Sequence, residues 1–230
     1  MRVKATLAIA VASAACGRVG FEQRVVPGGD AAFDGVGDGM PASLIHQYSF
    51  ASSLADDLGG PALTGLGGAL VAGGYQFGAG QGLSVTGAVP PSVYTIEVEF
   101  SFVDVTGYRK VIDFKELGSD AGLYVVDTQL QFVVIPVTGC PGNDCYTSPP
   151  LLVTVNTPVK VALSRAASGT IIGYVNGTPE LTFTDGGAVG VFDGAGGGAN
   201  FFVDDTVTST EDCAGTVRRI RIFDAAVAPP

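Results

Sequence analysis

The sequence predicts an all-β domain built as an antiparallel two-sheet β-sandwich, and three observations carry this prediction. Short runs of alternating apolar and polar residues, rich in Val, Thr, Phe and Tyr, recur along the chain. Glycine contributes 34 residues without a G-X-Y period, which indicates many tight turns rather than collagen. Helix-type patterning is nearly absent after residue 15, so the candidate elements are strands.

The clearest element is the stretch 159–184. Two alternating runs, VKVALSR and TIIGYV, precede the dipeptide Asn176-Gly177. This dipeptide readily supplies the two positive φ angles of a type I′ hairpin turn. The run 180–184 then returns along the second, so the stretch predicts an antiparallel meander with one apolar and one polar face.

Similar runs predict further strands, for a total of about thirteen. The longest is Tyr94–Phe102, in which the aromatic and aliphatic side chains share one face, and Glu97 and Glu99 share the other. The remaining candidates are Leu44–Phe50, Leu70–Ala72, Tyr75–Phe77, Leu83–Val85, Arg109–Phe114, Gly122–Val126, Leu130–Ile135, Leu151–Val155, Asn200–Val203 and Val217–Phe223. So many short strands imply two packed sheets rather than one.

The N-terminus has the features of an export signal. Arg2 and Lys4 precede an apolar run, and small residues follow, so residues 1–15 are predicted to be a signal peptide. Cys16 after two alanines resembles a bacterial lipobox, which implies lipidation of Cys16; ordinary cleavage is the alternative, because Ser13 stands where lipoboxes carry leucine. Residues 16–43, rich in Gly and Asp, predict a flexible tether and leave 44–230 for the domain.

The net charge and the hydropathy of the chain exclude some classes of binding partner. The chain has 12 basic and 22 acidic residues, a net charge of −10, which disfavours nucleic acid and anionic lipid headgroups. No apolar run reaches the roughly 18 residues that a transmembrane helix needs. Membrane attachment is therefore expected through the lipid alone, on an exported protein of the outer membrane, the periplasm or the cell exterior.

Several segments together resemble laminin-G-like domains, which are jelly rolls of the concanavalin A-like lectin and glucanase group. The segments that carry the resemblance are the opening strand 46–50 with its L-x-D-x-L-G-G-P turn, Tyr94–Phe102, Gly122–Tyr124, Tyr174–Gly177 and the closing strand Val217–Asp224. The resemblance implies a concanavalin A-like jelly roll. It also implies a non-catalytic binding role at the cell surface, with a glycan or a cell-surface protein as the partner.

Sugar sites usually combine an aromatic platform with hydrogen-bonding side chains, and this chain has no Trp. Tyrosines are therefore the candidate platforms, with polar residues nearby in sequence as their partners. The predicted ligand-binding residues are Tyr108, Arg109, Asp113, Tyr124, Asn143 and Tyr146. For Tyr124, packing in the core is an equally good interpretation.

The resemblance also implies a structural Ca²⁺, which carboxylates and loop carbonyls would hold. The candidate ligands are Asp56, Asp57, Asp193, Asp204 and Asp205. Arg218 stands where the family's last strand carries an Asp, which implies either loss of that site or an internal Arg–carboxylate pair in its place. Zinc is disfavoured, because one His and scattered thiols do not supply a tetrahedral ligand set.

Four cysteines in an exported chain suggest oxidising conditions. Cys140 and Cys145 flank the turn Pro-Gly-Asn-Asp, so a disulfide between them is predicted. Cys213 is then unpaired, unless it takes one of these two as its partner.

Nothing in the sequence favours catalysis. Glu97 and Glu99 resemble part of a glycosidase signature, but Phe102 stands where its third acid belongs, and strand alternation already explains both glutamates. His46 is the single histidine, and no nucleophile or phosphate-binding motif is present. We expect no enzyme; the alternatives are a degenerate or unrecognised glycoside hydrolase or lyase, and a structural envelope lipoprotein with no small ligand.

Overall fold

The computed structural model describes residues 43–134, 146–192, 198–206 and 210–229. All of them belong to one compact unit, residues 39–230. Within these ranges the chain forms fifteen β-strands and no α-helix, so the all-β prediction is confirmed. Accordingly, none of the described segments is a helix of the length and hydropathy that crossing a membrane requires.

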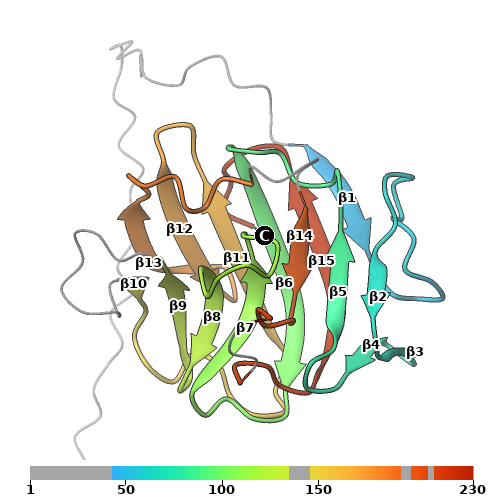
Figure 1. Cartoon of the computed structure of the whole chain (residues 1–230). Helices are drawn as coiled ribbons and strands as arrows, with labels where there is room; N and C mark the ends of the chain where they lie inside the picture. The colour runs from blue at the N-terminus through green and yellow to red at the C-terminus, as the bar shows by residue number, and fades with distance from the viewer. Residues whose placement is uncertain (1–42, 135–145, 193–197, 207–209, 230) are drawn as a thin grey trace, which may run out of the picture. The chain divides into compact units, whose positions relative to one another are not determined.

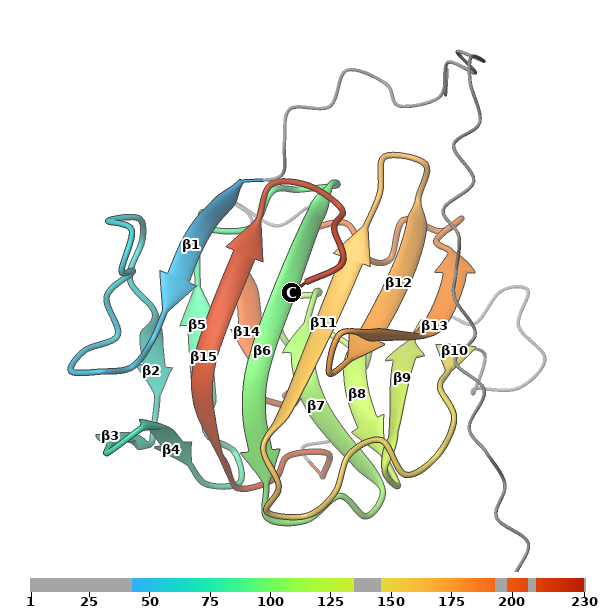
Figure 2. The ribbon, with the colours of Figure 1, turned by 180° about the vertical axis from the view of Figure 1, so that it is seen from behind.

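The strands form two antiparallel sheets, one behind the other (Figure 1), which confirms the predicted β-sandwich. The seven-stranded sheet has the order β10 (Tyr146–Thr147), β9 (Gln129–Val133), β8 (Gly122–Val126), β7 (Tyr108–Asp113), β14 (Ala199–Phe201), β5 (Gly82–Val85) and β2 (Thr64–Leu66). The eight-stranded sheet has the order β13 (Thr178–Thr184), β12 (Thr170–Val175), β11 (Val159–Arg165), β6 (Tyr94–Phe102), β15 (Gly215–Phe223), β4 (Gly74–Phe77) and β3 (Ala69–Val71). The remaining strand, β1 (Leu44–Tyr48), pairs with β15, as Figure 2 shows from the other side.

Aromatic side chains from both sheets meet between the layers. Phe77 of β4 stacks on Phe202, which directly follows β14, with ring centroids 4.4 Å apart. Phe100 and Phe102 of β6 pack against the same ring at 5.4 and 5.8 Å. Each of these rings is buried, so this cluster joins the two sheets and supplies a large share of the apolar burial.

The predicted meander is present as β11, β12 and β13, paired in sequence order. Asn176 and Gly177 have φ angles of 50° and 82°, as the type I′ turn requires. The central strand β6 has the predicted bounds Tyr94–Phe102.

The predicted strand at Leu151–Val155 is wrong, because the chain bends there. Two prolines precede Leu151, which has a φ of 68°, a value that no strand residue adopts. The backbone N–H groups of Leu152 and Val153 donate instead to the carbonyl oxygen of Thr128. The short strands β2 and β10 were not predicted. β2 is Thr-Gly-Leu, whose single large apolar side chain gives no pattern, and β10 has only two residues.

Candidate functional site

A groove of about 360 Å³ lies at one edge of the sandwich, where β10 of one sheet contacts β13 of the other. One wall is an aromatic pair: the rings of Tyr146 and Phe183 stack with centroids 3.7 Å apart and an angle of 15° between them. We call this feature the edge groove. The residues that line it are Val134, Tyr146, Phe183, Thr184, Asp185, Gly186, Gly187 and Val189.

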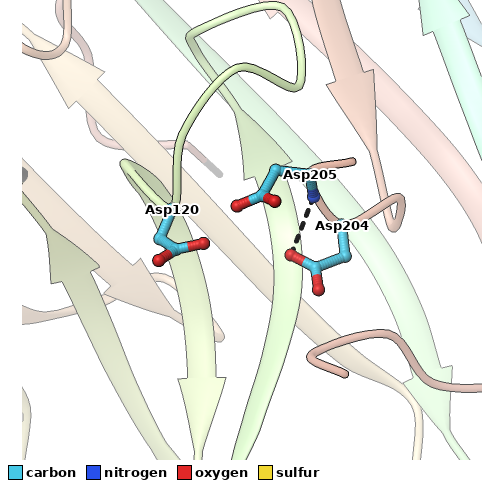
Figure 3. Close-up of side chains that lie close together, drawn as sticks. All are labelled: Asp120, Asp204 and Asp205. Carbon is cyan, nitrogen blue, oxygen red and sulfur yellow. Dashed lines mark hydrogen bonds between the residues drawn. The ribbon is translucent and has the colours of Figure 1, made fainter. Parts of the chain in front are cut away.

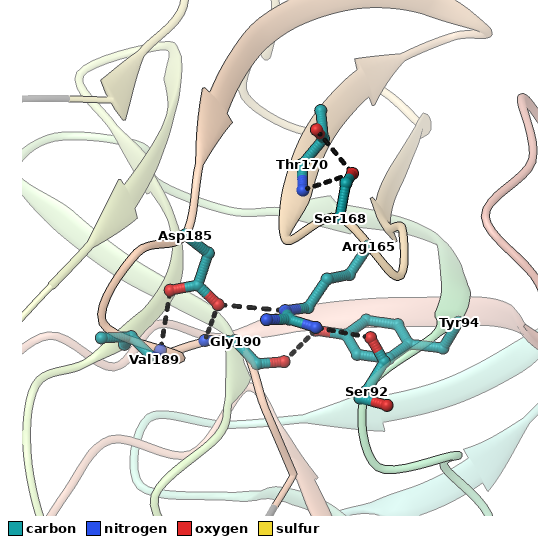
Figure 4. Close-up of polar contacts among 8 residues, drawn as sticks. All are labelled: Ser92, Tyr94, Arg165, Ser168, Thr170, Asp185, Val189 and Gly190. Carbon is teal, nitrogen blue, oxygen red and sulfur yellow. Dashed lines mark hydrogen bonds and ion pairs between the residues drawn. The ribbon is translucent and has the colours of Figure 1, made fainter.

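A buried ion pair holds the polar side of the edge groove in place (Figure 4). Asp185 Oδ2 accepts hydrogen bonds from Arg165 Nε and the Gly190 N–H, both at 3.0 Å, and Oδ1 accepts one from the Val189 N–H at 2.7 Å. The guanidinium also donates to the Ser92 carbonyl oxygen at 2.6 Å. Because its charge is matched by Arg165 and both oxygens are engaged, Asp185 shapes the loop and leaves the groove without strong net charge.

The composition of the edge groove suits a small neutral molecule. Its volume falls within the range of roughly 300–1,000 Å³ that is typical of small-molecule sites. Tyr146 and Phe183 supply apolar surface, while Thr184 and the main chain of Gly186 and Gly187 supply hydrogen-bonding groups. A second groove, lined by residues such as Ser84, Glu116 and Asn200, measures about 260 Å³ and has no aromatic wall.

A second cluster of functional groups lies on the outer face of the seven-stranded sheet. Lys110 of β7 pairs with Tyr124 of β8, and its Nζ lies 4.4 Å from the centre of the Tyr124 ring. The register of β7 shifts between Lys110 and Ile112, which brings Asp113 onto the same face as Lys110. Lys110 Nζ and Asp113 Oδ2 are 4.0 Å apart, and both side chains are fully buried.

Three aspartates, drawn in Figure 3, gather close to one another near Lys110. Asp120 lies in the loop between β7 and β8, and Asp204 and Asp205 follow β14. The carboxylate oxygens that they can offer lie within 4.8 Å of one another. Asp204 also accepts hydrogen bonds from the backbone N–H groups of Asp205 and Glu211, at 2.8 and 2.9 Å. We call Asp120, Asp204 and Asp205 the acid cluster.

Burial and mutual repulsion shift the titration of these groups. Hydrogen bonding to Asp205, followed by burial, raises the pKa of Asp120, and burial raises the pKa of Asp113 and Glu211. Burial also lowers the pKa of Lys110 against the opposing pull of Asp113 and the neighbouring acids. Each shift favours the uncharged form, as expected where several ionisable groups share a desolvated site.

Several buried polar atoms around the acid cluster lack hydrogen-bond partners in the part of the chain that the structure describes. They are Lys110 Nζ, Asp113 Oδ2, Tyr124 Oη and Glu211 Oε2. Tyr124 Oη is close enough to Glu211 for burial and that acid to raise its pKa, yet the two make no hydrogen bond of normal geometry. Buried polar atoms are almost always partnered by protein or by ordered water, so these four atoms make the surroundings of the acid cluster unusual.

The six predicted ligand-binding residues do not form one site. Tyr108, Asp113 and Tyr124 share the outer face of the seven-stranded sheet, where Tyr108 and Tyr124 pack edge to face at 5.8 Å. Tyr124 is fully buried, so its ring is packed as a core residue would be. Arg109 pairs with Asp104 at 2.6 Å, and Tyr146 lines the edge groove. Asn143 lies outside the described residues.

The predicted calcium ligands also lie at different places in the structure and do not form one site. Asp204 and Asp205 meet in the acid cluster, with Asp120, which the sequence did not single out. Asp56 lies elsewhere, after β1, and its carboxylate is occupied by His46 Nδ1 at 2.6 Å and by the backbone N–H groups of Gln47, Leu58 and Gly60.

Asp57, beside Asp56, accepts hydrogen bonds from side chains of the same segment, Gln47 and Ser49. Asp193 lies outside the described residues. Arg218 is exposed at the bulge of β15, in the other sheet, so the cation beside the acid cluster is Lys110.

The predicted lipidation site, Cys16, and the predicted disulfide partners, Cys140 and Cys145, lie outside the described residues. Cys213 is a buried free thiol, whose Sγ lies 3.2 Å from the carbonyl oxygens of Asp104 and Ala214.

Glu97 and Glu99, the acids considered for catalysis, lie on the outer face of the eight-stranded sheet. Glu97 accepts two hydrogen bonds from the Arg221 guanidinium at 2.8 Å, and Glu99 lies 3.0 Å from Arg219 Nη2. Glu97 is nevertheless buried, because Arg221 and Lys160 of the flanking strands lie over it. Both carboxylates are thus engaged in cross-strand ion pairs.

Sequence reasoning missed Asp185 in the edge groove, and Lys110, Asp120 and Glu211 at the acid cluster. A signal was available for Lys110, which follows Tyr108 by two residues in an alternating run and therefore shares its face. For Asp185, Asp120 and Glu211 no periodicity applies, because they lie outside the strands.

No protein-family model matches the chain, and no curated protein matches it. Solved structures do share its fold. Domain 4 of AbnA, a GH43 extracellular arabinanase from Geobacillus stearothermophilus solved with arabinotriose, matches with a TM-score of 0.54 and 16% identity over 81% of this chain and 94% of that chain.

Two other kinds of protein match over 80% of this chain. Trypanosoma rangeli sialidase in complex with sialic acid has a TM-score of 0.60 and 15% identity, and 31% of its length is covered. The binding domain of botulinum neurotoxin serotype D has a TM-score of 0.55 and 13% identity, and 49% of it is covered. At these identities the likeness concerns the fold alone: the chain is a β-sandwich of the kind found in these proteins, without a specific tie to the laminin-G-like family.

Proposed function

We propose that this chain is a non-catalytic binding module that recognises carbohydrate in the edge groove. The observation that carries the proposal is the stacked pair Tyr146 and Phe183, which lines a groove of fitting volume together with Thr184, Gly186 and Gly187. Sugars present apolar C–H faces and many hydroxyls, so they need aromatic surface and hydrogen-bonding groups together.

Two structures of the same fold support this class of ligand. The arabinanase domain was solved with arabinotriose and the sialidase with sialic acid, so β-sandwiches of this architecture occur in proteins that bind sugars. Between these two ligands, the edge groove favours the neutral one, because Asp185 is a carboxylate and its partner Arg165 is buried. An anionic sugar would meet no exposed cation among the lining residues that the structure describes.

The state of the carboxylates in the edge groove and on β6 supports a binding rather than a catalytic role. Glycosidases use two carboxyl groups, placed about 5–9 Å apart, which must be available to the substrate. In the edge groove Asp185 is engaged by Arg165 and two backbone N–H groups, and Glu97 and Glu99 are held by arginines on the other sheet. The proposal places the module outside the cell, on a lipid attached to Cys16.

A glycan array with the purified protein, repeated in chelator, tests the proposal. We expect binding to neutral oligosaccharides in preference to sialylated ones. Gly186→Phe should abolish it, since a Cβ at Gly186 meets no atom within 4 Å and its φ is ordinary, so the ring would fill the groove without strain.

Thr182→Phe is the matched control, because it adds the same ring at an exposed position of β13 that does not line the groove. Wild-type binding in Gly186→Phe would contradict the proposal, as would the absence of binding to any glycan. The latter result would favour a protein partner.

A further inference from the structure

We propose that Asp120, Asp204 and Asp205 bind a hard divalent cation, with calcium preferred, which ties the β7–β8 loop to the segment after β14. This inference is independent of the edge groove. It joins Asp204 and Asp205, two of the calcium ligands that the sequence suggested, with Asp120 from a separate loop, and leaves out Asp56 and Asp57.

The geometry of the three carboxylates matches a coordination sphere. Calcium–oxygen distances are about 2.3–2.6 Å, so two ligands on opposite sides of one ion are at most about 5 Å apart. The candidate oxygens of the acid cluster lie within 4.8 Å of one another. The three side chains can therefore reach one ion without moving apart.

The backbone already holds the two loops together at this point. The Thr206 N–H donates to the Leu117 carbonyl oxygen at 3.3 Å, and the Lys110 N–H donates to the Glu211 carbonyl oxygen at 3.0 Å. Asp204 and Asp205 are buried and Asp120 is partly exposed, so an ion could reach the cluster from the Asp120 side.

Buried oxygen atoms outside the acid cluster also support the binding of a cation. Tyr124 is fully buried and its Oη lacks a hydrogen-bond partner among the described residues, although it lies close to Asp120, Asp204 and Glu211. Glu211 Oε2 is also buried and unpartnered. A cation beside these atoms, with its bound waters, would satisfy oxygens that the protein leaves unsatisfied.

The charge balance favours a cation as well. Four carboxyl groups, on Asp113, Asp120, Asp204 and Glu211, act on the ammonium group of Lys110, and Asp205 lies beside Asp120 and Asp204. Lys110 lies closest to Asp113, at 4.0 Å, and offsets one of these charges. A divalent cation would offset two more in a place where water does not screen them.

The donor set selects the class of ion. All the candidate ligands are oxygens, which suit calcium, magnesium and manganese and disfavour zinc or copper. Calcium accepts an irregular set of ligands, whereas magnesium requires a near-ideal octahedron. Carboxylates contributed by two loops therefore fit calcium better than magnesium.

Isothermal titration calorimetry of the chelator-treated protein with Ca²⁺, Mg²⁺ and Mn²⁺ tests the proposal. We expect one Ca²⁺ per chain, with a Kd of roughly 10⁻⁵–10⁻³ M, the range of sensor and extracellular sites. Asp205→Asn should weaken binding by about tenfold or more, because affinity depends on ligand charge. Ca²⁺ should also raise the Tm of the wild type and leave that of Asp205→Asn nearly unchanged.

Asp57→Asn is the matched control, since it removes an exposed carboxylate at the alternative calcium position and should leave the Kd unchanged. If Asp205→Asn does not fold, Asp120→Asn makes the same measurement at a partly exposed loop residue. The proposal is overturned if the wild type binds none of the three ions at millimolar concentration. It is also overturned if Asp57→Asn weakens binding while the cluster variants do not.

Discussion

Arg165 and Asp185 form a buried ion pair, with Nε and Oδ2 3.0 Å apart and side-chain exposures of 8% and 2%. The pair between Arg219 and Glu99 has the same N–O distance, but its side chains are 36% and 27% exposed. The two pairs share the same charged groups and the same N–O distance, but they differ in burial and in the further hydrogen bonds that Arg165 and Asp185 make.

We expect Arg165→Met to lower the free energy of unfolding by roughly 3–5 kcal/mol, because it leaves the Asp185 carboxylate buried without its countercharge. Arg219→Met should lower it by about 1 kcal/mol or less, since water screens the exposed pair. Urea unfolding at neutral pH measures both. Equal losses in the two variants would show that burial does not control the contribution of these pairs.

A pH dependence should follow from Asp56, which is placed in the loop after β1. Burial acts to raise the pKa of Asp56, but hydrogen bonds from His46, Gln47, Leu58 and Gly60 outweigh it and hold the pKa below its usual value. A carboxyl group whose pKa is lower in the folded state stabilises the fold above its unfolded pKa, near 3.9, and loses that contribution as the pH falls through the folded pKa.

The difference in unfolding free energy between the wild type and Asp56→Asn should therefore be fully present above about pH 4 and shrink below it. Taking the difference removes the opposite contribution of Asp113, whose pKa burial raises. Urea titrations between pH 7 and pH 3 provide the curve. A difference that stays constant over this range would contradict the assignment.

The fold was predictable where local pattern and tertiary structure agree. Alternation gave the bounds of β6, and the turn chemistry of Asn176-Gly177 gave the hairpin between β12 and β13. The order of strands within each sheet was not predictable, because β6 lies between β11 and β15, its partners from distant parts of the chain. Alternation defines which face a side chain takes and says nothing about which strand becomes its neighbour.

The sites were predictable only in part, for a related reason. Asp204 and Asp205 were singled out, but Asp120 meets them from a loop 84 residues earlier (204 − 120) that carries no period. The bulge in β7 brings Asp113 to the face of Lys110, whereas unbroken alternation would place the two on opposite faces. A bulge changes the face of every residue beyond it, and this segment has no sequence signal for it.

Lys110 should compete with a cation at the acid cluster. Lys110→Met removes a positive charge beside Asp120, Asp204 and Glu211, so we expect Ca²⁺ to bind about tenfold more tightly, a gain on the order of 1 kcal/mol for one nearby charge. Calorimetry measures the two dissociation constants. Lys160→Met is the control, because Lys160 pairs with Glu97 on the opposite sheet. Weaker binding in Lys110→Met would show that Lys110 supports the site instead.

Tyr146 should contribute to sugar binding through its ring rather than its hydroxyl. The ring stacks on Phe183 and forms the aromatic wall of the edge groove. We expect Tyr146→Phe to bind the preferred oligosaccharide within about threefold of the wild type. Tyr146→Leu should lose about tenfold or more, since replacing an aromatic anchor commonly costs over 1 kcal/mol.

Leucine keeps apolar contact with Phe183, so a comparison of the Tm values of the two variants separates a loss of binding from a loss of folding. If Tyr146→Leu bound the oligosaccharide with wild-type affinity, the ring of Tyr146 would not be part of the binding site. A large loss in Tyr146→Phe would instead identify the hydroxyl as a hydrogen-bonding group. In that case the sugar would be held mainly by polar contacts along the wall formed by Thr184, Gly186 and Gly187.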